Sequence, residues 1–88
     1  MESGDHHQLL FVQLVMSLHA ETMHFLGKTK HPVTDKIERN LDAARNAIDM
    51  LEMLEVKTKG NLGDEEGQFL TQVLQEVRLN YVDEANKP

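Results

Sequence analysis

Cysteine is absent from this 88-residue chain, and no cluster of basic side chains is found in it. Without cysteine the chain can form neither disulfides nor thiolate metal sites, which favours a reducing compartment, so we expect a cytoplasmic protein. Fifteen acidic residues against nine basic ones give a formal charge of −6. Because this charge repels phosphates, we expect no nucleic-acid partner.

The sequence also lacks a β-strand pattern, an internal repeat and a membrane-spanning segment. The first seven residues are acidic where a secretory signal is positive, and no small-residue cleavage site follows. The most apolar stretch, 9–26, contains Glu21, and a carboxylate within a membrane helix costs about 2.5–3.5 kcal/mol. We therefore expect an all-α fold and no membrane insertion.

The stretch 9–26 organises the chain, because its apolar residues cover about two-thirds of a helix circumference. At about 100° per residue they fall on two adjoining stripes. The first stripe is Phe11, Leu14, Val15, Leu18, Phe25 and Leu26, and the second is Leu9, Val12, Met16, Ala20 and Met23. The narrow polar seam that remains holds Gln13, Ser17, Glu21 and His24. A helix of this kind must be surrounded by protein.

Local signals predict three helices, at about 6–27, 35–58 and 64–83, joined by short linkers. They form one helical domain, and we expect its ends to be flexible, at 1–5 and 84–88.

The helix ends carry their own signals. Gly27 and Gly60 stand where the first two helices should end in a left-handed residue. Asp35, with Glu38 three residues later, fits a capping box that would begin the second helix.

The first helix is expected to be central and to form a dimeric helical bundle. Two helices of the same chain can each cover only one side of it, so one apolar stripe is left over. Soluble monomers seldom expose such a patch, which predicts a homodimer. The second stripe is favoured for the interface, because the aromatic stripe better suits a protomer core, although either could face the partner copy. The predicted interface residues are Leu9, Val12, Met16, His19 and Met23.

Few residues suggest chemistry. Glu21 and His24 have the Glu-x-x-His spacing of di-iron carboxylate bundles, but both fall in the polar seam, whereas such ligands project into the core. His19 lies within the apolar arc and needs a hydrogen-bond partner. The candidates are Glu55, Asn40, a backbone carbonyl or a side chain of the partner copy. No serine or cysteine nucleophile is paired with it.

We therefore expect a non-enzymatic oligomerisation or adaptor protein, without a cofactor and with an unidentified protein as a further partner. The alternative is a dimer that binds a metal or a small ligand near Glu21, His24 or His19.

Several motifs resemble a family of small bacterial proteins known as domain of unknown function 1844. The matching residues are the run Leu41-Asp42-Ala43-Ala44-Arg45 through Ile48-Asp49, the run Lys57-Thr58-Lys59-Gly60-Asn61-Leu62, the pair Glu65-Glu66, and Arg78 and Tyr81. The resemblance covers about residues 11–82. It departs at Gly63, where the family pattern has a hydroxyl residue that caps the third helix. The resemblance implies a short, soluble helical protein and no activity.

Overall fold

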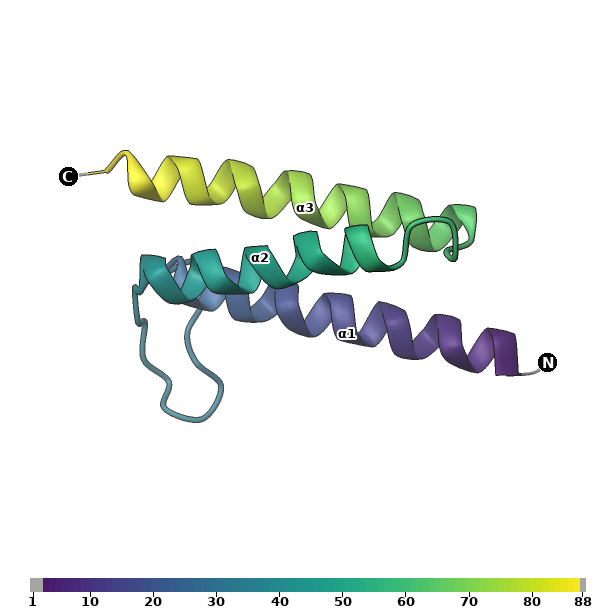
Figure 1. The fold of residues 1–88 in the computed structure, drawn as a ribbon. Coiled ribbons are helices and arrows are strands. Elements are labelled where there is room, and N and C mark those ends of the chain that lie inside the picture. Colours follow the sequence, from purple (N-terminus) through teal and green to yellow (C-terminus); the bar gives the residue numbers. More distant parts are fainter. Residues whose placement is uncertain (1–2, 88) are drawn as a thin grey trace.

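The computed structural model describes residues 3–87, and this part of the chain folds into three packed helices. These are α1 (Ser3–Phe25), α2 (Leu41–Lys57) and α3 (Asp64–Ala85). Each helix contacts the other two, and α2 runs antiparallel to both α1 and α3 (Figure 1). The expected all-α class with three helices is confirmed. None of these helices combines the length and the apolar character that crossing a membrane requires.

The core lies where the three helices meet. Its buried residues are Val15, Ile48, Leu51, Leu70, Val73, Leu74 and Val77. Phe11 and Leu18 pack against this cluster from α1 while remaining partly exposed. Thr22 is also buried on α1, and its hydroxyl donates to the Leu18 carbonyl at 2.7 Å, which satisfies the polar group locally. Within one chain, α1 is therefore packed through one side only.

Leu14 corrects the predicted division of α1 into stripes. It was expected in the protomer core, but its side chain is 47 % exposed. Both neighbouring helices pack on the side of α1 that carries Val15, Leu18 and Thr22, and Leu14 lies at the edge of that arc. The apolar stripe is wider than the surface that α2 and α3 cover, so the side chains at its edge remain exposed to water.

The predicted start of the second helix is wrong. α2 begins at Leu41, and Asn40 is its N-cap, since the Ala43 N–H donates to Asn40 Oδ1 at 3.0 Å. Asp35 lies instead in a loop and is left-handed, with a φ of 56°. His31 organises this loop: its Nδ1 accepts hydrogen bonds from the amides of Val33 at 3.1 Å and Thr34 at 3.4 Å.

The loop 26–40 is closed at its base and projects from the bundle (Figure 1). Leu26 and Arg39 form an isolated antiparallel bridge, and the Asn40 N–H donates to the Phe25 carbonyl at 2.8 Å. The loop 26–40 is longer than the linker between the predicted helices at 6–27 and 35–58.

Two predicted glycine positions are confirmed as left-handed. Gly27, with a φ of 80°, follows α1, where the Lys28 N–H donates to the Met23 carbonyl at 2.9 Å and the Gly27 N–H donates to the His24 carbonyl at 3.0 Å. This pair of bonds is a Schellman motif. Gly60, with a φ of 85°, lies in the turn between α2 and α3.

The outer helix ends extend further than expected. α1 already includes Ser3, and residues 1–2 of the predicted flexible N-terminus lie outside the described residues, as does Pro88. Gly63 is the N-cap of α3, and its N–H donates to Glu66 Oε1 at 2.8 Å. α3 continues to Ala85, and Glu84 is buried, with 6 % exposure.

Candidate functional site

The largest apolar exposure on α1 is a surface that we call the outer face. It comprises Leu9, Leu10, Gln13, Leu14, Met16, Ser17 and Ala20, all of them exposed. Its four large apolar side chains are about half exposed: Leu9 53 %, Leu10 45 %, Leu14 47 % and Met16 56 %. At about 100° per residue the outer face spans about 160° of the helix. No Asp, Glu, Lys or Arg occurs between Asp5 and Glu21, so this surface carries no formal charge.

The predicted interface residues are divided between the outer face and its border. Leu9 and Met16 are exposed, whereas Val12, His19 and Met23 are half-buried. Leu10 and Leu14 belong to the outer face but were not predicted there, because Leu10 was placed in neither stripe and Leu14 in the protomer core. The period of the apolar residues shows how wide the apolar arc is, but it does not show which part the neighbouring helices cover.

His19 is turned toward α3 rather than toward any of its expected partners. Its Nε2 lies 3.1 Å from Glu76 Oε1, within ion-pair range, although the angle is not that of a hydrogen bond. The His19 side chain is 31 % exposed. The partner is on a different helix from Asn40 and Glu55, so spacing along the sequence could not indicate it.

His24 is the one member of the predicted polar seam that the structure buries. Its exposure is 8 %, because the loop 26–40 lies against it, and its Nε2 lies 3.3 Å from Glu38 Oε1. Glu21 remains exposed. Among residues 3–87 no three His, Asp or Glu side chains are arranged to hold a metal ion, and the spacing of Glu21 and His24 therefore has no supporting ligand set.

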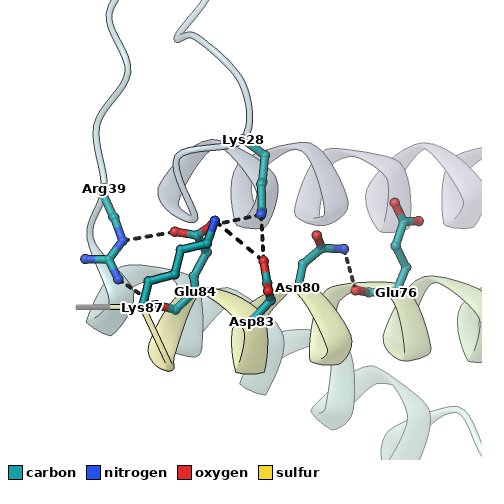
Figure 2. A network of polar contacts seen from close by, with 7 residues as sticks. All are labelled: Lys28, Arg39, Glu76, Asn80, Asp83, Glu84 and Lys87. Atoms are coloured by element: carbon teal, nitrogen blue, oxygen red, sulfur yellow. Dashed lines mark hydrogen bonds and ion pairs between the residues drawn. The ribbon is translucent and has the colours of Figure 1, made fainter.

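Glu84 is the buried centre of an ionic cluster that the sequence did not reveal (Figure 2). Its carboxylate accepts contacts from Lys28 Nζ at 2.8 Å, Arg39 Nε at 3.1 Å and Lys87 Nζ at 2.7 Å. Arg39 Nη2 also donates to the Glu84 backbone carbonyl at 2.7 Å. Lys28 and Arg39 stand near the two ends of the loop 26–40, so the cluster fastens the base of this loop to α3.

The charges of the cluster shift the proton affinity of its members. The hydrogen bond from Lys28, followed by that from Lys87, lowers the pKa of Glu84 to about 2, against the opposing effect of burial. The same contact with Glu84 raises the pKa of Lys28. A carboxylate that is paired with three cations stabilises the fold, and it is not available as a general acid or base.

The residues that carry the family resemblance have structural roles between α2 and α3. Arg78 Nη2 and Nε both donate to Glu52 Oε2, at 3.0 and 3.2 Å. Arg45 lies over the ring of Tyr81, 5.9 Å from its centroid. The run 57–62 forms the end of α2 and the turn into α3. These residues lie in the α2–α3 hairpin, and none of them belongs to the outer face of α1.

Fold and surface together define a small three-helix protein in which α1 carries an exposed, uncharged apolar face. The chain belongs to the family described as Domain of unknown function (DUF1844), whose model matches residues 8–83. Searches of curated proteins and of solved structures returned no match. The family description names no activity, so function has to be argued from the surfaces.

Proposed function

We propose that this protein is a non-catalytic assembly module that forms a homodimer through the outer face of α1. The observation that carries the proposal is the exposure of Leu9, Leu10, Leu14 and Met16 on one face of a single helix. Four large apolar side chains gathered in this way are typical of an interaction surface rather than of a soluble monomer. We place the dimer in the cytoplasm, because a chain without cysteine suits a reducing compartment.

A second copy is the partner that the charges favour. The chain as a whole carries −6, so two copies repel each other over most of their surfaces. The outer face is uncharged, and two such faces can be buried together without leaving any formal charge unpaired. Ser17 and Ala20 are small and continue the outer face toward the end of α1, which lets two helices approach closely there. A two-fold axis through this face uses every contact twice.

The proposal is tested by the mass of the full chain in solution. Light scattering after gel filtration at micromolar concentration should give twice the 10.1 kDa of one chain. Met16→Lys should give a folded monomer, because it places a charge in the interface at the most exposed apolar side chain of the outer face. Leu79→Lys is the matched control, since Leu79 is 73 % exposed on α3 and should tolerate the change. A monomeric wild-type chain would overturn the proposal and would leave an adaptor role toward a different protein.

A further inference from the structure

A cavity of about 530 Å³ lies between the end of α1 and the loop 26–40. Its size falls within the range of small-molecule sites in proteins. Ala20 and Phe25 on α1 and Pro32 in the loop provide its apolar walls. The cavity adjoins the outer face at Ala20 but differs from it in chemistry, because it also contains ionisable groups.

The charged groups of the cavity are all of one sign. Glu21 and Glu38 both line it, and no lysine or arginine does. Among the described residues neither carboxylate pairs with a lysine or arginine, and the only ion pair of Glu38 is the 3.3 Å contact with His24. Two carboxylates beside aromatic and apolar walls attract a cation and repel an anion.

His24 adds a second, independent indication of a ligand. It lines the cavity, it is 8 % exposed, and its Nδ1 is buried without a hydrogen-bond partner among the described residues. Because Nε2 faces a carboxylate of Glu38, Nε2 carries the proton of the neutral ring and Nδ1 presents a lone pair. A buried acceptor of this kind lacks a donor, which the N–H group of a ligand would supply.

The second imidazole of the cavity argues against a metal. His31 Nδ1 already accepts from the amides of Val33 and Thr34, so the neutral ring of His31 carries its proton on Nε2. Neither nitrogen then offers a free lone pair to a metal ion. His31 lies edge-on to His24, with ring centroids 4.9 Å apart, and forms part of an aromatic wall.

We propose that this cavity binds a small organic cation, a primary amine or guanidinium that carries a short aliphatic chain. The cationic N–H groups meet Glu38 and Glu21, while the aliphatic chain lies against Phe25 and Pro32. His24 positions Glu38 through its Nε2–H. The site lies within one chain and does not require the homodimer, so the two proposals can fail independently.

The test uses NMR spectra of the full chain, titrated with agmatine and with 1,4-diaminobutane. Both amines should cause saturable shifts in the ring signals of His24 and His31, and butanoate and 1-butanol should cause none. Glu38→Gln should weaken amine binding about tenfold or more, because it removes a charge that contacts the ligand. Glu65→Gln is the matched control, since it removes an exposed carboxylate in the first turn of α3, and α3 begins at the opposite end of the bundle from the loop 26–40 (Figure 1).

Three results would overturn the assignment. One is the absence of saturable shifts with either amine at millimolar concentration. Another is equal binding of the amines by wild type and Glu38→Gln. The third is saturable binding of zinc alone at His24 and His31, which would identify a metal site in place of a site for organic cations.

Discussion

Lys28 and Glu84 form a 2.8 Å ion pair that joins the end of α1 to the end of α3. The Glu84 side chain is 8 % exposed, and Lys28 covers it together with Arg39 and Lys87. Because Arg39 directly precedes the N-cap of α2, this one carboxylate holds all three helices in register at the same end of the bundle.

The first prediction concerns the acid stability that this cluster provides. The pKa of Glu84 falls from 4.5 to about 2 on folding, so the folded state favours the carboxylate. The resulting stabilisation is complete above pH 4.5 and is lost as the pH falls toward 2. In urea unfolding followed by circular dichroism, Glu84→Gln should therefore be less stable than wild type at neutral pH, and the difference should shrink over that range.

The contributions of the two lysines give a control for this prediction. Lys28→Met should reduce the pH dependence more than Lys87→Met, because Lys28 makes the largest contribution to the shift in the pKa of Glu84. The prediction fails if the difference in the free energy of unfolding between wild type and Glu84→Gln stays constant from pH 5 to pH 2. The cluster would then not stabilise the ionised carboxylate.

The second prediction concerns the start of α2. Asn40→Ala removes the side-chain oxygen that accepts from the Ala43 N–H, and it should lower the free energy of unfolding by about 1 kcal/mol. Asn46→Ala, at an exposed position within the same helix, should be neutral or slightly stabilising. Equal effects of the two changes in thermal or urea unfolding would contradict the assigned cap.

The competition between two caps shows what local sequence can decide. The Gly27 motif was predictable because its hydrogen bonds join residues that are neighbours in the chain. Asp35 and Asn40 are both competent caps, and the choice between them depends on distant contacts. Arg39 is fixed by Glu84, which places the helix start immediately after it.

The candidate sites were predictable to different degrees. An apolar arc around most of α1 was evident from the sequence, and Leu9 and Met16 are exposed within it. The burial of His24 beside His31 and Glu38 was not evident, because the loop 26–40 is held by contacts between residues distant in the sequence, such as Arg39 with Glu84. Periodicity describes the faces of a helix, whereas tertiary contacts decide what covers each face.

The third prediction compares two glycines with opposite requirements. Gly27→Ala should lower stability by about 1 kcal/mol, because a side chain is disfavoured at its φ of 80°. Space is not the cause, since the nearest atom to an added Cβ is Arg39 Cβ at 3.7 Å. Gly67→Ala, inside α3, should raise stability by about 0.5–1 kcal/mol, because its added Cβ has no atom within 4 Å apart from its chain neighbours and the backbone of its own helix. Calorimetric melting curves of the two variants should therefore shift in opposite directions.

The last prediction asks which border of the outer face lies against the second copy. Leu9 and Met16 stand along one border, Leu10 and Leu14 along the other, and the first pair is the more exposed at 53 % and 56 %. More apolar area is therefore removed from water when the partner helix covers the border that carries Met16. Met16→Lys should raise the dimer dissociation constant about tenfold or more, and by more than Leu10→Lys does. Sedimentation equilibrium of the two variants measures this order directly, and the reverse order would place the partner helix on the Leu10 and Leu14 border.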